Sequence, residues 1–131
     1  MEIDFKKWFI ILGIVVGLGF YVKSHYTFKD VLAYSKSHPD PKMSPKIDYY
    51  VGVAHYMRSE YAESAEAFEQ LLSDYPTCQY APRALLKLGT MYIDRREWEK
   101  AKVHLERYVE DYPNGPDIKI VQTKYDAVKF K

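Results

Sequence analysis

The chain of 131 residues is short of the residue types that carry most catalytic and metal-binding chemistry. Cys78 is its single cysteine, which excludes an intramolecular disulfide and a cysteine metal cluster. Its 19 basic and 18 acidic residues give a net charge of +1, so nothing global attracts nucleic acid. HExxH, CxxCH, GxSxG and glycine-rich phosphate-loop motifs are all missing. We therefore predict a protein that is not an enzyme, with no catalytic residue, metal, cofactor or small-molecule substrate.

Charge is absent from one stretch near the N-terminus, "WFIILGIVVGLGFYV", which lies between Lys7 and Lys23. At about 1.5 Å per helical residue this run covers a little over 20 Å, and flanking lysines extend its reach toward the roughly 30 Å of a bilayer core. Trp8 and Tyr21 lie where an aromatic belt is expected. A cleaved signal peptide is the competing interpretation, but no small-x-small cleavage site or lipid-attachment cysteine follows. We favour an uncleaved single-pass anchor over residues 1–26.

Two features of this anchor bear on its surroundings. The lysines before the span form a compact cluster, which favours the N-terminus inside and the rest outside, as in a bacterial inner membrane with a periplasmic domain. Gly13 and Gly17 form a GxxxG pattern, which lets two membrane helices pack closely. Glycine is also common in membrane helices in general, so both interpretations of this pair stay open.

Beyond the anchor, the sequence repeats with a period of 37 residues. Asp-Tyr-Pro occurs at 74–76 and again at 111–113. The same offset pairs Pro45 with Pro82, Gly52 with Gly89, Tyr61 with Trp98 and Phe68 with Leu105. Matches that run through a whole unit indicate a structural repeat rather than a chance coincidence of one turn.

Each unit has the pattern of two helices followed by a proline. The first helix begins near Pro45, with Ser44 as its expected cap, and the second covers 61–75. The second unit predicts helices over 81–94 and 97–111. With its small residue, its aromatic positions and its closing proline, this unit resembles the tetratricopeptide repeat. The phrase Tyr-x-x-x-Ala…Phe…Tyr-Pro is similar to the repeats of bacterial envelope proteins, namely the outer-membrane assembly lipoprotein and the Tol–Pal coordinator.

The expected architecture is all-α: one transmembrane helix, then a short right-handed solenoid of the tetratricopeptide type with a C-terminal capping helix. The solenoid domain covers 27–131. It comprises a degenerate half repeat at 27–39, repeat 1 at 45–78, repeat 2 at 82–113 and the capping helix at 116–131. In the capping helix an apolar stripe should cover the stack, while Lys119, Lys124 and Lys129 should face water.

The resemblance implies that a partner protein binds the concave surface lined by the first helix of each repeat. The candidate residues on those helices are Tyr49, Val53, Tyr56, Met57, Arg83, Leu86, Thr90 and Ile93. The same side chains could instead be covered by the half repeat. These helices carry no asparagine, which disfavours a carboxylate clamp and favours an apolar or mixed segment as ligand.

The leading hypothesis is a membrane-anchored adaptor or scaffold subunit of a larger membrane or cell-envelope complex. Two alternatives remain. One is a receptor that captures transient peptide segments in the groove. The other is an accessory subunit docked mainly through its transmembrane helix.

Overall fold

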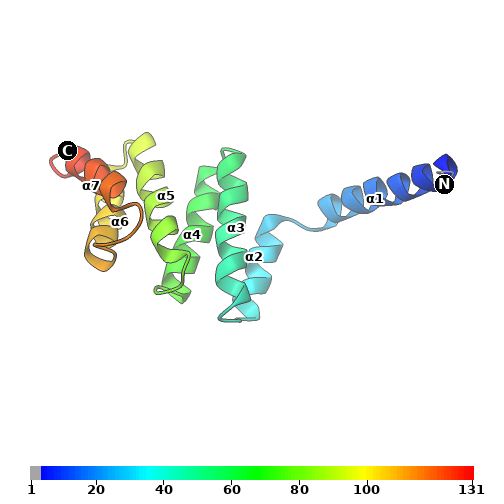
Figure 1. Ribbon diagram of the computed structural model, residues 1–131, viewed down its shortest axis with the longest axis horizontal. Helices are drawn as coiled ribbons and strands as arrows, with labels where there is room; N and C mark the ends of the chain where they lie inside the picture. The colour runs from blue at the N-terminus through cyan, green and yellow to red at the C-terminus, as the bar shows by residue number, and fades with distance from the viewer. Residues whose placement is uncertain (1–3) are drawn as a thin grey trace.

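The structure, a computed structural model, describes residues 4–131, and over this range all of its regular elements are helices (Figure 1). There are seven: α1 (Phe5–His25), α2 (Phe28–Ser37), α3 (Met43–Met57), α4 (Tyr61–Asp74), α5 (Ala81–Asp94), α6 (Trp98–Asp111) and α7 (Ile118–Val128). The expected all-α fold, with one apolar helix and six shorter ones, is confirmed. The first three residues of the predicted anchor lie outside the described range.

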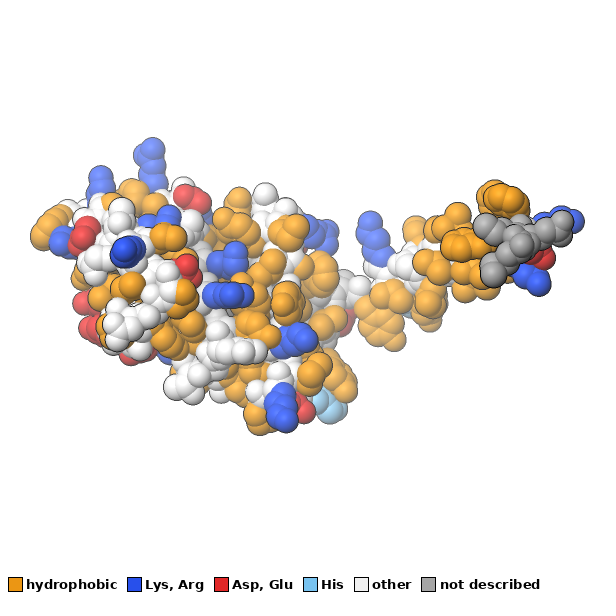
Figure 2. Space-filling view, in the orientation of Figure 1, with side chains coloured by type: hydrophobic (Ala, Val, Ile, Leu, Met, Phe, Trp, Pro, Cys, Tyr) orange, Lys and Arg blue, Asp and Glu red, His pale blue; other side chains and the backbone are white. Residues whose placement is uncertain are grey.

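Helix α1 projects away from the packed helices (Figure 1), and orange hydrophobic side chains cover most of its visible surface (Figure 2). None of its residues is buried, and it is long and apolar enough to cross a membrane, with a mean hydropathy of 1.7. Tyr26 ends α1 and Thr27 begins α2, where Thr27 and Asp30 form a reciprocal capping box. Helix α2 therefore starts at the end of the apolar helix.

Helices α3 and α4 form one antiparallel hairpin, and α5 and α6 form a second. Glycine permits the close approach in both. A Cβ at Gly52 would lie 2.7 Å from the Phe68 ring, and one at Gly89 would lie 2.5 Å from Leu105 Cδ2. No real Cβ contact is this short, so the close packing inside each hairpin requires glycine at these positions.

The turns inside the two hairpins are built alike. Ser59 and Arg96 both adopt φ 58°, in the left-handed region. The following residue then donates its N–H back into the first helix, Glu60 to His55 O and Glu97 to Tyr92 O, each at 2.9 Å. The 37-residue period therefore extends to backbone conformation.

The start of α3 differs from the expectation. Ser44 is not its N-cap: the helix begins at Met43, and Ser44 is buried within its first turn. Asp40 takes the capping part instead, because its carboxylate accepts the N–H groups of Lys42 and Met43 at 2.8 and 3.0 Å. The Ser44 hydroxyl in turn accepts the Asp40 N–H at 2.9 Å.

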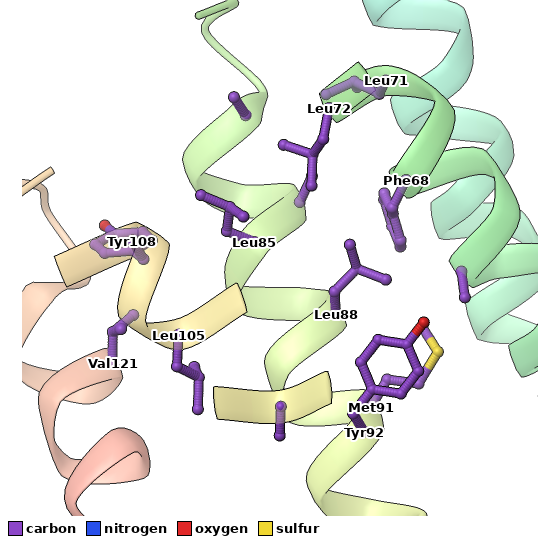
Figure 3. Close-up of a cluster of buried hydrophobic side chains, with 14 of the residues drawn as sticks. Phe68, Leu71, Leu72, Leu85, Leu88, Met91, Tyr92, Leu105, Tyr108 and Val121 are labelled. Carbon is purple, nitrogen blue, oxygen red and sulfur yellow. The ribbon is translucent and has the colours of Figure 1, made fainter. Parts of the chain in front are cut away.

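The main core lies between α4, α5, α6 and α7, whose apolar side chains point toward one another (Figure 3). Phe68, Leu85, Leu88, Leu105 and Tyr108 have no exposed surface. Helix α7 closes this end of the stack by burying Val121 and Val128. A second, smaller cluster of Leu32, Val51 and Ala67 joins α2, α3 and α4.

Candidate functional site

A groove of about 450 Å³ opens between the first helices of successive units and α7. Helix α3 contributes two tyrosines, α5 contributes basic and apolar side chains, and α7 closes the far side. The lining residues are Tyr49, Tyr56, Arg83, Leu86, Lys87, Thr90, Asp117, Ile120 and Lys124. This set is called the groove below.

The structure brings five of the predicted binding residues together in the groove: Tyr49, Tyr56, Arg83, Leu86 and Thr90. Three others lie outside it. Val53 and Ile93 are half-buried and pack against the main core, so they contribute to stability rather than to the lining. Met57, at the end of α3, is 79% exposed, beyond the lining.

Half repeat α2 does not cover the groove, so the alternative raised at the sequence level does not hold for its lining. Tyr49 and Tyr56, the two tyrosines of the groove, differ in their burial and in their neighbouring side chains. Tyr49 is buried and packs against Phe68 and Tyr80, with ring centroids 5.8 and 5.0 Å away. Tyr56 is half-buried, and Lys87 Nζ lies 5.2 Å from its ring centroid, within cation–π range. Tyr56 is thus the more available of the two.

Sequence reasoning missed four of the lining residues: Lys87, Asp117, Ile120 and Lys124. Three of them belong to α7 or its N-cap. The expectation that Lys124 faces open water is wrong, because α7 lines the groove as well as covering the core. The 37-residue period could have indicated these residues, since α7 begins at Ile118, 37 residues after the start of α5 at Ala81. Helix α7 thus has the position of the first helix of a third unit.

The electrostatics of the groove are mainly cationic. Three basic side chains, Arg83, Lys87 and Lys124, line it together with one acidic residue, Asp117. Burial raises the pKa of Tyr49, and the nearby Arg83 guanidinium partly offsets this rise. A segment that combines apolar side chains with a carboxylate complements such a surface.

Gly13 and Gly17 lie on α1, away from the groove. A Cβ added at either would meet nothing within 4 Å, so in the isolated chain neither glycine serves a close contact. Their expected role in packing α1 against a membrane helix stays a prediction.

His55, the one histidine that is buried among the described residues, has a structural environment. It is buried, its Nδ1 lies 2.6 Å from Glu60 Oε2, and its ring packs edge-on to Phe28. The His55 ring is therefore satisfied within the packing of the domain. Across residues 4–131, no group of three His, Cys, Asp or Glu side chains is arranged to hold a metal ion.

Comparison with known proteins gives one result that covers most of the fold. A family model described as YfiO, outer membrane lipoprotein, matches residues 41–123, from the turn before α3 into α7. The match covers more than half of the chain and includes every residue of the groove except Lys124. No curated protein matches the chain.

Proposed function

The chain belongs to the family of YfiO outer membrane lipoproteins, and from this we propose that it is a non-catalytic scaffold subunit of a cell-envelope complex. The observation that carries the proposal is the groove, because it presents basic, aromatic and apolar side chains on three packed helices. Such surfaces bind protein segments rather than transform substrates. The family supports a place in an outer-membrane assembly complex.

Attachment to the membrane is the point at which this chain departs from a lipoprotein. No cysteine precedes Cys78, so nothing between α1 and the repeats offers the thiol to which a lipid is attached. Helix α1 supplies an alternative, because it has the length and composition of a membrane span. We propose that α1 is retained as the anchor, that it spans the inner membrane, and that the repeats face the periplasm.

Co-purification from mild detergent tests the scaffold role. The wild-type chain should bring down a stoichiometric partner. The double variant Arg83→Glu with Lys87→Glu should lose it, because two positive charges of the groove are reversed. Lys36→Glu with Arg107→Glu is the matched control: it changes the net charge equally, at residues outside the groove, and should keep the partner. A solitary monomer in the wild-type preparation would contradict the proposal.

A separate measurement tests whether α1 is retained or cleaved. The mass of the mature protein should correspond to the full chain, and the protein should stay in the membrane fraction after a carbonate wash. A mature N-terminus beyond Tyr26 would show instead that α1 is a signal sequence.

A second candidate function, capture of transient peptide segments, is favoured by the availability of Tyr56 and Lys87 in the groove. It predicts micromolar binding of short acidic-apolar peptides that Tyr56→Ala weakens. Tyr56 is the better position for this test, because Tyr49→Ala would also remove core packing. The third candidate, docking through α1, predicts that Gly13→Leu with Gly17→Leu releases the chain from its complex.

A further inference from the structure

At the N-terminal end of the stack, α2 and α3 present an apolar surface that none of residues 4–131 covers. It is lined by Phe28, Val31, Met43, Lys46, Ile47 and Tyr50, and these residues are called the open face below. It encloses a hollow of about 340 Å³. Phe28, Val31, Met43 and Tyr50 are between 36% and 54% exposed.

The 37-residue period identifies what the open face corresponds to. One unit later, Phe28, Val31 and Ile47 become Ala65, Phe68 and Ala84, on α4 and α5. Those three residues are 7%, 0% and 0% exposed. At these three positions the same apolar surface therefore exists twice in the chain. It is covered in the second copy and uncovered in the first.

Helix α3 is part of the cover of the second copy. Tyr49 of α3 packs against Phe68 and Tyr80, the counterparts of Val31 and Met43, and Gly52 of α3 lies directly over the Phe68 ring. The open face is thus the place where the first helix of a preceding repeat would lie. Its geometry is that of a helix site.

Helix α1 does not supply that helix. Counted back by 37 residues, Gly52 falls on Val15, so α1 has a β-branched residue where both repeats have glycine. Helix α1 is also apolar around its circumference, and none of its residues is buried in the structure. A second copy of the chain offers nothing better, because its α3 and α5 are already packed within their own hairpins. Its α7, which has the position of a first helix, carries Asp126 where α3 and α5 have glycine.

The charge of the open face indicates which side chains a helix bound there would carry. The residues that line the open face include one charged side chain, Lys46, and no carboxylate. Its counterpart in the next unit, Arg83, lies at the edge of the groove beside α3. A helix seated on the open face would place its polar side near Lys46, where an acidic residue is complementary.

We propose that the open face binds an amphipathic α-helix of a partner protein, which completes the half repeat in trans. This helix has an apolar stripe with i, i+3, i+4 and i+7 spacing, a small residue over Val31 and an acidic residue near Lys46. The proposal rests on the scaffold function and names a second docking surface for it, distinct from the groove. Because α2 begins directly after α1, the partner helix lies close to the end of α1.

Photocrosslinking in native membranes tests this occupant. A benzoylphenylalanine replaces Tyr50, which lies in the open face, or Tyr34, which is 61% exposed on α2 and lies outside it. The Tyr50 position should yield an adduct whose crosslinked peptide is an amphipathic helix with the pattern above, and the Tyr34 position should not. An adduct with lipid, an adduct with a second copy, a peptide without the pattern, equal labelling from Tyr34, or no adduct would each overturn the proposal.

A chimera tests the helix site independently of any partner. Residues 43–60, which contain α3 and its turn, replace residues 6–23 of the chain. If the open face accepts a first helix, the chimera should melt about 5 °C or more above the wild-type chain in the same detergent. Val31→Glu should abolish that gain, whereas Tyr34→Glu should keep it. An unchanged or lower melting temperature for the chimera would overturn the assignment.

The two proposals fail in different ways. If Val31→Glu retains the co-purified partner that Arg83→Glu with Lys87→Glu loses, the inference about the open face is wrong and the scaffold function stands. If the wild-type chain is solitary and no Tyr50 adduct forms, both are wrong.

Discussion

The N-terminal layer (α2–α4) and the C-terminal layer (α5–α7) share a repeat pattern but have different interiors. All five of the buried polar or charged residues among the described residues lie in the N-terminal layer: Ser35, Ser44, Asp48, His55 and Ser64. The C-terminal layer holds Leu85, Leu88 and Leu105 without exposed surface, and its last helix, α7, covers α5 and α6. The N-terminal layer also leaves its open face uncovered.

This difference shows that one repeat pattern can form both a covered layer and a partly uncovered one. Apolar burial stabilises the C-terminal layer by about 25 cal/mol for each Å² removed from water. The N-terminal layer forgoes part of this gain, because Phe28, Val31 and Tyr50 stay partly in solvent. The covered C-terminal layer therefore contributes more to the stability of the domain, and the uncovered N-terminal layer provides its free apolar surface.

The largest expected effect comes from cutting a side chain in the closed layer. Leu105→Ala should lower the free energy of unfolding by about 2–5 kcal/mol, because it leaves a cavity between α5, α6 and α7. Val31→Ala, on the open face, should cost less than about 1 kcal/mol, because Val31 is 40% exposed. Chemical denaturation monitored by circular dichroism measures both. Equal losses would remove the contrast between the layers.

Substitutions of the two hairpin glycines test how much added side-chain volume each layer tolerates. Gly52→Ala and Gly89→Ala should each destabilise by about 2 kcal/mol, because the new Cβ would press on Phe68 or Leu105. We expect the larger loss at Gly89, where α7 encloses the neighbouring side chains. Gly17→Ala is the control and should leave the repeat domain unchanged, since nothing lies within 4 Å of that position.

Asp48 gives the most direct test of the polar interior. It is 1% exposed, and among the described residues no partner hydrogen-bonds to either carboxylate oxygen. The counterpart in the next unit is Leu85. Asp48→Leu should therefore raise the free energy of unfolding at neutral pH by roughly 1–2 kcal/mol, because it removes an unsatisfied buried group.

The loss of stability caused by Asp48 should also depend on pH in a defined direction. Burial raises its pKa, and the nearby Ser35 and Gln70 offset the rise only in part. As pH climbs through the ordinary carboxyl pKa of about 4, the unfolded chain releases this proton while the folded chain retains it, which destabilises the fold. The advantage of Asp48→Leu should accordingly be small near pH 3 and large near pH 7. An advantage that grows on acidification would contradict this account.

The smallest effect concerns what the two layers share. Ser59 and Arg96 both occupy the left-handed region, where glycine has no steric penalty. Ser59→Gly and Arg96→Gly should each stabilise by about 0.5 kcal/mol, net of the added backbone entropy of the unfolded chain. Thermal melts of the two variants should agree closely. A large difference would show that the layers differ in their turns as well as in their interiors.

The sequence alone determined the order and type of the helices. Proline and glycine positions, apolar spacing and the 37-residue period act through local backbone preference and helix pairing, which can be read without coordinates. Five of the predicted binding residues fall in the groove for the same reason, because a repeat fixes which helix faces inward.

Tertiary packing decided the rest. It placed Lys124 in the groove, turned Val53 and Ile93 toward the core, gave the cap of α3 to Asp40, and left Asp48 buried without a partner. Each of these depends on which neighbouring helix covers a given face. Periodicity specifies an apolar face, but only the neighbouring helices determine whether that face is covered, as Phe68 is, or open, as its counterpart Val31 is.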